Sequence, residues 1–142
     1  MFVTQKNQYA LRAIFELAKH RGMGLRKISD IAQAQQIPPR FLEVILSQLK
    51  RFGLVESKRG YTGGYALLRP PEQITVGEVF RFDEKGTAPV DCIACISQNN
   101  CPHPHKRGCA FLPMWKKVRD SIFDIYDSTT IADLLAQEKE NA

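Results

Sequence analysis

The sequence predicts a mainly α-helical fold with a small β wing. Three segments within residues 1–52 repeat apolar side chains at helical spacing, and a glycine-rich turn between two extended runs follows them. A further, strongly amphipathic helix is predicted after Pro113. The 142 residues are 44% hydrophobic and 25% charged and contain no apolar run of membrane-spanning length, as is typical of a soluble globular protein.

Charge is distributed unevenly along the chain. Residues 1–70 contain 12 lysines and arginines against 4 acidic residues, whereas residues 71–142 contain 8 against 11, within a net charge of +5. A basic half favours a polyanionic partner, most simply nucleic acid, with surface solubility as the alternative. The N-terminus lacks a signal-peptide pattern, so we expect a cytoplasmic, reducing location in which disulfides are disfavoured.

The first predicted helix covers residues 7–20. Arg12, Glu16 and Lys19 are expected to lie off its apolar face, and Gly22 follows its end. The apolar face is formed by Ala10, Leu11, Ile14, Phe15, Leu17 and Ala18.

A helix-turn-helix is predicted next. A short helix around Ile28 and Ile31 precedes a polar break. A third helix then begins near Pro39 and runs to about Phe52, since proline is tolerated in the first helical turn. Two helices joined by a tight turn can place the second one in the major groove of DNA.

The outward positions of this third helix are candidate DNA contacts. Arginine can bridge guanine O6 and N7, and glutamate can accept a hydrogen bond from a cytosine amino group, so we expect Arg40 and Glu43 to read bases. Val44 and Ser47 share the outward face. A solvated helix face, or contact with phosphate only, is the alternative for these side chains.

A two-stranded wing is predicted after Gly53, which is expected to cap the third helix. Extended runs begin at Leu54 and at Tyr65, and the glycine-rich turn lies between them. Lys58 and Arg59 lie at the wing tip, where a long cationic side chain can reach phosphate or the minor groove. The full set of predicted DNA contacts is Arg26, Lys27, Arg40, Glu43, Ser47, Lys50, Lys58, Arg59 and Tyr61.

All cysteines of the chain are gathered on one loop rich in Gly, Pro, Asn and His. They are Cys92, Cys95, Cys101 and Cys109. Four thiols on one loop favour zinc or an iron-sulfur cluster, because both metals prefer thiolate ligands, and the spacing does not separate the two. His103 and His105 are possible alternative ligands or plain loop residues.

Two N-cap patterns occur in the C-terminal half. Thr75 with Glu78 predicts a capping box that opens a short helix, and Thr130 with Asp133 predicts a second, shorter cap. The final residues, 137–142, are expected to be mobile.

The helix predicted over residues 114–126 has an apolar stripe at coiled-coil spacing. Such a stripe can pack on its own domain or pair with its twin in a second chain. Pairing would place two recognition helices about one DNA turn, or a multiple of it, apart, which predicts a palindromic operator. The side chains expected to mediate dimerisation are Trp115, Val118, Ile122 and Ile125.

Several of these segments resemble the Rrf-two family of bacterial transcription regulators, of the IscR and NsrR type. The resemblance rests on GYTGGYALLRPPEQIT at 60–75, VGEVF directly after it, GLVES at 53–57, the N-terminal MFVTQKNQYALRAIFELA, the cysteine loop and W-x5-SIFDIYDSTTIADLL. It implies a homodimeric winged-helix repressor or activator of double-stranded operator DNA. In such a regulator a 2Fe-2S or 4Fe-4S cluster in the cysteine loop sets DNA binding in response to iron, redox state or nitric oxide. It also implies that Glu43 helps to discriminate between DNA sites and that Arg59 enters the minor groove.

The cysteine loop departs from the family pattern, in which cluster-binding relatives typically offer three cysteines. Cys109 matches the last of these and Cys101 the middle one, while Cys92 and Cys95 compete for the first place.

Two non-cysteine ligands found in other family members are missing from this chain. The histidine ligand of some family members falls on Leu112 here, and the acidic ligand of others falls on Gln8. The fourth ligand is therefore expected to be the extra cysteine, or else His103 or His105.

Two other functional classes are weighed. An enzyme would pair a thiol with a histidine, such as Cys101 with His103 or Cys109 with His105, but no third orienting group is suggested, so we do not expect an enzyme. A zinc-stabilised winged-helix module that binds DNA or protein without a sensing role is the stronger alternative.

The predicted organisation has three parts. Residues 1–82 form a winged helix-turn-helix DNA-binding domain, residues 83–110 form a cysteine-rich cluster-binding loop, and residues 111–142 form the long C-terminal dimerisation helix and tail.

Overall fold

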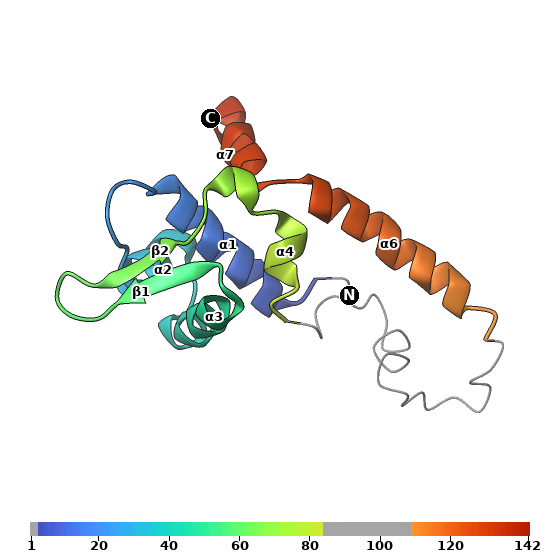
Figure 1. Ribbon diagram of the computed structural model, residues 1–142, viewed down its shortest axis with the longest axis horizontal. Coiled ribbons are helices and arrows are strands. Elements are labelled where there is room, and N and C mark those ends of the chain that lie inside the picture. The colour runs from blue at the N-terminus through green and yellow to red at the C-terminus, as the bar shows by residue number, and fades with distance from the viewer. Residues whose placement is uncertain (1–2, 84–108) are drawn as a thin grey trace.

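The computed structural model describes residues 3–83 and 109–142. Its elements are α1 (Gln5–Lys19), α2 (Ile28–Gln35), α3 (Pro39–Phe52), β1 (Val55–Lys58), β2 (Gly64–Leu67), the short 3₁₀ helix η1 (Pro71–Gln73), α4 (Val76–Phe80), α6 (Leu112–Ser128) and α7 (Ile131–Asn141). Figure 1 shows the two-stranded wing at one side of a helical body and α6 at the other. The mainly helical fold with a small β wing is thus confirmed.

Helix α1 lies at the centre of this body. It begins at an N-cap in which the side-chain oxygen of Thr4 accepts a hydrogen bond from the Asn7 N–H at 3.1 Å. It packs against α2, α3, α4 and α7, so most of its circumference is covered. Ala13 and Ile14 are fully buried in the core. Glu16 is also buried, at 3% exposed, which contradicts the expectation that it lies off the buried side of the helix.

The turn between α2 and α3 is short and tightly bonded. Gln36 ends α2 in the left-handed region with φ 53°, and the Ile37 N–H donates to the Ala32 carbonyl at 3.0 Å. Helix α3 spans Pro39–Phe52 and is capped by Gly53, as the sequence predicts. Its buried face, which anchors the helix-turn-helix to the core, consists of Leu42, Ile45, Leu46 and Leu49.

The wing is an antiparallel pair in which Val55 lies opposite Leu67. The segment before α2 pairs with β2 through an isolated antiparallel β-bridge, in which Arg26 and Tyr65 exchange two backbone hydrogen bonds of 2.9 and 2.8 Å. Gly64 lies against this segment, and a side chain at Gly64 would overlap the Arg26 carbonyl group. The wing is therefore attached to the entrance of the helix-turn-helix.

Helix α4 begins at Thr75, whose hydroxyl accepts a hydrogen bond from the Glu78 N–H at 3.1 Å. The Glu78 carboxylate does not return to the Thr75 backbone but pairs with Arg69. The predicted capping box is therefore a simple N-cap, because the neighbouring guanidinium is a stronger partner for the carboxylate.

Helix α7 begins at a complete capping box. The Thr130 N–H donates to Asp133 at 2.9 Å, and the Asp133 N–H donates to the Thr130 hydroxyl at 3.0 Å. The helix continues to Asn141 and so includes most of the polar residues 137–142 predicted to form the tail. An ion pair of 3.1 Å between Lys19 and Glu138 joins this terminal segment to α1.

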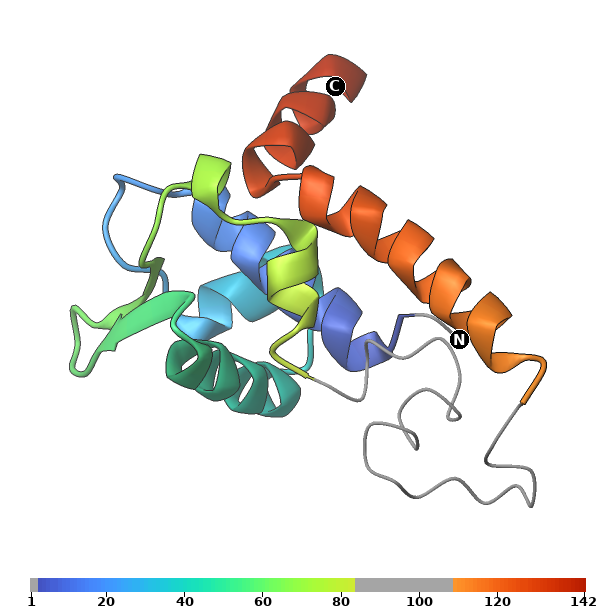
Figure 2. The same cartoon turned by 45° about the vertical axis from the view of Figure 1, so that its right-hand side comes forward.

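Helix α6 lies along the outside of the domain and contacts α4 (Figure 2). The two helices are joined by a bidentate ion pair, in which the Arg81 guanidinium donates to both Asp127 oxygens at 2.6 and 2.8 Å. Phe80 and Tyr126 meet edge to face, with ring centroids 4.9 Å apart. None of the described helices is long and apolar enough to cross a membrane.

Candidate nucleic-acid interface and cysteine loop

The outward face of α3 is exposed as the sequence predicts. Arg40, Glu43, Val44 and Ser47 are all solvent-accessible, and the opposite side of the helix is in the core. The face therefore presents a cation, a carboxylate, an apolar group and a hydroxyl within two helical turns. Such a mixture of groups can contact base edges and phosphates.

Lys50 connects this helix to the wing. Its ammonium donates to the Ser57 hydroxyl at 2.6 Å, and Ser57 lies on β1. Lys50 remains exposed, so one side chain both fixes the wing relative to α3 and presents positive charge.

The wing turn presents Lys58, Arg59 and Tyr61 to solvent, with Tyr61 91% exposed. The ammonium of Lys27 lies 4.8 Å from the centre of the Tyr61 ring, within the range of a cation–π contact. Lys27 is the N-cap residue of α2. The start of the helix-turn-helix and the tip of the wing therefore form one basic surface.

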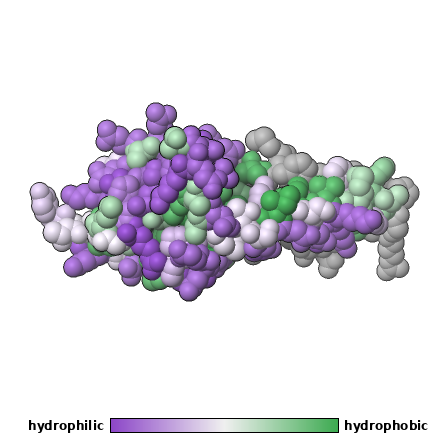
Figure 3. Space-filling view, turned by 90° about the horizontal axis from the view of Figure 1, so that it is seen from above, coloured by the Kyte–Doolittle hydropathy of each residue, from purple (hydrophilic) through white to green (hydrophobic). Residues whose placement is uncertain are grey.

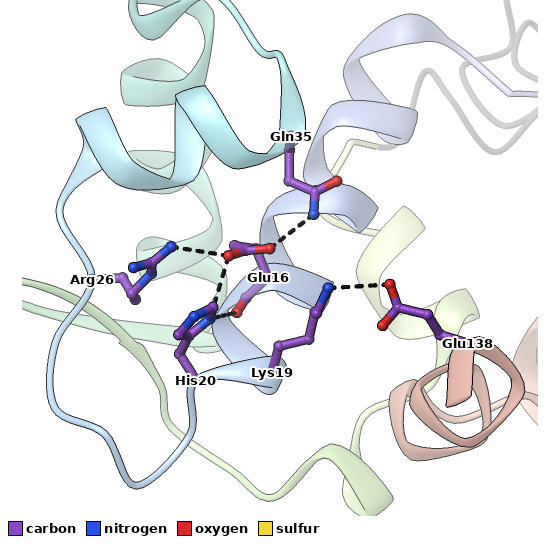
Figure 4. A network of polar contacts seen from close by, with 6 residues as sticks. All are labelled: Glu16, Lys19, His20, Arg26, Gln35 and Glu138. Carbon is purple, nitrogen blue, oxygen red and sulfur yellow. Dashed lines mark hydrogen bonds and ion pairs between the residues drawn. The ribbon is translucent and has the colours of Figure 1, made fainter. Parts of the chain in front are cut away.

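Arg26 has a different position from the other predicted DNA contacts. Its Nη2 donates to the buried carboxylate of Glu16 at 3.0 Å. Gln35 on α2 donates to the other oxygen of the same carboxylate at 2.9 Å, and His20 Nδ1 lies 3.3 Å from the oxygen that faces Arg26 (Figure 4). Arg26 therefore helps to hold together α1, α2 and the segment that pairs with β2, while its contact with DNA stays a prediction.

This polar network was not predicted from the sequence. Glu16 has the spacing of a surface residue on an amphipathic helix, and only its partners on other elements explain its burial. The i, i+4 placement of Glu16 and His20 is a local feature that could have suggested a paired carboxylate.

The cysteine loop enters the described structure at its last cysteine. Cys109 is partly buried, and its carbonyl accepts a hydrogen bond from the Leu112 N–H at 3.4 Å, so it directly precedes α6. Gln8 is exposed on α1. The other predicted ligands lie outside the described residues, namely Cys92, Cys95, Cys101, His103 and His105.

The donor set of this loop suits a sulfur-preferring metal centre. Cys109 is a free thiol, and three further thiols and two imidazoles precede it within the predicted loop, residues 83–110. Thiolates hold iron-sulfur clusters and zinc, and imidazole can replace one of them in either case. The residues present therefore fit the cluster that the family resemblance implies.

The stripe predicted to mediate dimerisation remains accessible on α6. Trp115, Val118 and Ile122 are only partly buried, and Ile125 is 65% exposed. Figure 3 shows apolar surface beside hydrophilic side chains on the part of the molecule that extends to the right, where α6 lies in Figure 1. By contrast, Tyr126 faces α4 and packs against the domain's own core.

Together, the helix-turn-helix, its exposed α3 face and the adjoining basic wing define a DNA-binding protein of the winged-helix class. The Rrf2 family model, described as "Iron-dependent Transcriptional regulator", matches residues 3–137. The chain belongs to the Rrf2 family, which confirms the resemblance to the Rrf-two family, and it is a transcription regulator rather than an enzyme.

Relatives of two kinds are similar to this chain over nearly its whole length. The HTH-type transcriptional regulator CymR of Bacillus subtilis (strain 168) is 35% identical over 134 residues, which cover 94% of this chain and 89% of CymR. The solved structure of T. potens IscR has a TM-score of 0.77 at 31% identity and covers 98% of this chain and 89% of that one. The solved structure of CymR, the global cysteine regulator of B. subtilis, has a TM-score of 0.76 at 32% identity, and the match covers 95% of this chain and 96% of CymR.

Proposed function

We propose that this protein is a homodimeric regulator whose DNA binding is controlled by an iron-sulfur cluster on the cysteine loop. The observation that carries the proposal is the position of the loop in the chain. It follows α4, which closes the DNA-binding domain, and ends at Cys109, directly before α6. In the chain, a metal centre there would come between the winged-helix domain and the helix proposed to join two chains.

In the proposed DNA complex, the N-terminal part of α3 lies in the major groove. Arg40 and Glu43 contact base edges there, because both are exposed on the side of α3 that faces away from the core. Lys58 and Arg59 at the wing tip contact phosphate or the minor groove. Lys27, Ser47, Lys50 and Tyr61 are proposed as supporting contacts around them.

The proposed dimer forms through α6. Trp115, Val118, Ile122 and Ile125 follow one another at intervals of three and four residues, which is the spacing of a helix-pairing seam. Their accessibility in the single chain supports association with a second copy, because removing an apolar stripe from water lowers the free energy of the system. A two-fold pair would present two wings and two α3 helices to a palindromic operator.

The ligands proposed for the cluster are Cys92, Cys95, Cys101 and Cys109, with His103 or His105 as alternatives for one position. When bound, an iron-sulfur cluster supplies a centre that responds to iron supply, redox state or nitric oxide. Cys109 ties one end of the loop to the first turn of α6.

The other end of the loop is tied to the DNA-binding domain. Asp83, its first predicted residue, pairs with Lys6 of α1 at 3.7 Å. The Lys6 ammonium also lies 5.4 Å from the centre of the Phe82 ring. A change in the order of the loop would therefore be transmitted to α1 at one end and to α6 at the other.

Zinc bound by the same thiolates is the second candidate, because these ligands suit both metals. The experiment that separates them is anaerobic purification of the full chain, followed by absorption spectroscopy and analysis of iron, sulfide and zinc. We expect brown protein with matching iron and sulfide. Single Cys→Ala variants should lose the cluster at three or four positions, while a Ser121→Ala control on α6 should keep it. Colourless protein with stoichiometric zinc would contradict the cluster proposal and favour the zinc-stabilised module.

A further inference from the structure

Two large apolar side chains lie unshielded among the polar residues of the α3 face. Val44 is 55% exposed and Phe41 is 62% exposed. Val44 is two residues from Leu42 and two from Leu46, which on a helix corresponds to a rotation of about 200°. Leu42 and Leu46 are fully buried, so Val44 points away from the core, at the middle of the outward face.

The neighbours of Val44 identify the kind of surface to which it belongs. Arg40 lies four residues before it and Ser47 three residues after it, so both are its neighbours on the helix surface. Arg51, one turn further on, is also exposed. An apolar group on a face with two cations, a hydroxyl and the Glu43 carboxylate is suited to a partner that has phosphates at its rim and both polar and apolar groups between them.

Duplex DNA has this chemistry in its major groove. Among the four bases only thymine presents a methyl group there, and side chains without hydrogen-bonding groups distinguish thymine by contact with that methyl. Valine is also a weaker helix former than alanine, leucine or lysine, so an exposed valine brings no advantage to α3 itself. A contact made only in the DNA complex would give the side chain a function.

We propose that Val44, with Phe41 beside it, reads the C5-methyl group of a thymine in each half of the operator. This inference rests on the proposed function, since it places α3 in the major groove. It assigns a specificity contact to residues other than the hydrogen-bonding pair Arg40 and Glu43, and it requires a thymine in each operator half-site.

The test compares thymine with deoxyuridine, which differs only by the absence of the methyl group. An operator is first selected from a random duplex library with the full-length protein, and each thymine is then replaced in turn. We expect one position per half-site at which deoxyuridine weakens binding about fourfold, the effect of burying one methyl-sized group, and about fifteenfold when both half-sites are changed. Replacement at the remaining positions should leave affinity unchanged.

Variants of the protein complete the test. Val44→Ser should bind the thymine operator about as weakly as the wild type binds the deoxyuridine operator, and it should no longer distinguish the two. Phe41→Ser should reduce the distinction in part. Leu68→Ser is the matched control and should retain the wild-type discrimination. Leu68 is also exposed and apolar, but it directly follows β2 at the end remote from the wing turn. Thermal melts verify that the variants are folded.

Three outcomes would overturn the inference. In the first, the wild-type protein binds the thymine and deoxyuridine operators with equal affinity at every position. In the second, Val44→Ser still distinguishes the two operators. In the third, Val44→Ser changes the oligomeric state of the protein, which would make this face a protein contact. Failure of the wild-type protein to select any duplex would instead count against the proposed DNA-binding surface, so the two failures are distinguishable.

Discussion

Glu16→Gln is the substitution that tests most sharply how the helix-turn-helix is held in place. The Glu16 carboxylate is 3% exposed and faces Arg26 Nη2 at 3.0 Å, Gln35 Nε2 at 2.9 Å and His20 Nδ1 at 3.3 Å. Glutamine has the same shape, but its amide nitrogen must face one of these donors, and the guanidinium loses its counter-charge. The pair is only partly buried, because the Arg26 side chain is 25% exposed, so leaving it unpaired costs about 1–3 kcal/mol.

The expected loss for Glu16→Gln is about 2 kcal/mol, because glutamine keeps one acceptor oxygen. It is measured by urea unfolding, as a lower midpoint at unchanged slope. Glu56→Gln on the exposed side of β1 is the control and should change stability by less than about 0.5 kcal/mol. If both variants unfold at the same urea concentration, the network does not stabilise the domain.

A double variant separates the ion pair from other effects of the substitution. Glu16→Gln combined with Arg26→Gln leaves no uncompensated charge, so it should be less destabilising than the sum of the two single variants. The expected coupling is about 1–3 kcal/mol, in the range measured for residues within one polar network. Simple additivity would refute the reasoning.

Three further outcomes are expected. Gly64→Ala should destabilise the domain by about 1–3 kcal/mol in urea unfolding, because the added methyl group overlaps a backbone carbonyl of the segment before α2; unchanged stability would contradict this. The hydrogen bonds from Arg81 hold the pKa of Asp127 below its ordinary value; partial burial opposes this shift and the charge of Arg81 reinforces it. The ion pair therefore stabilises the fold fully at a pH above the ordinary carboxyl pKa. This stabilisation is lost as the pH falls through the lowered pKa of Asp127. Asp127→Asn should therefore remove about 0.2–1 kcal/mol near neutral pH and progressively less below about pH 4, and parallel pH profiles of thermal midpoint for both proteins would contradict it. Trp115→Ser should raise the dimer dissociation constant at least tenfold in sedimentation experiments, and an unaltered constant would remove Trp115 from the interface.

The sequence-based prediction succeeds where local chemistry determines the structure. Helix α3 begins at Pro39 because proline suits the first turn, and it stops before Gly53 because glycine suits a left-handed C-cap. The cap at Thr130 was likewise predicted, and it forms a reciprocal pair with Asp133. These features depend on a few neighbouring residues and hardly at all on the rest of the fold.

The prediction fails where a residue's position depends on distant elements. Glu16 is buried because Arg26 and Gln35, far from it in sequence, converge on it, and periodicity alone assigns it to the surface. The final residues of α7 are helical, and Glu138 reaches Lys19 on α1, a contact that their polar composition does not indicate. The ion pair of Arg26 with Glu16 likewise depends on the tertiary structure, and a contact of Arg26 with DNA stays a prediction.

Of all measurements, operator affinity determined in one preparation with and without the cluster tests the central claim most directly. Fluorescence anisotropy would be recorded anaerobically on the holo form, after removal of the cluster, and after reconstitution. Control by the cluster predicts that affinity or site preference changes by about 5- to 150-fold between holo and apo forms, and returns on reconstitution. Identical affinity and site preference in all three states would contradict the account.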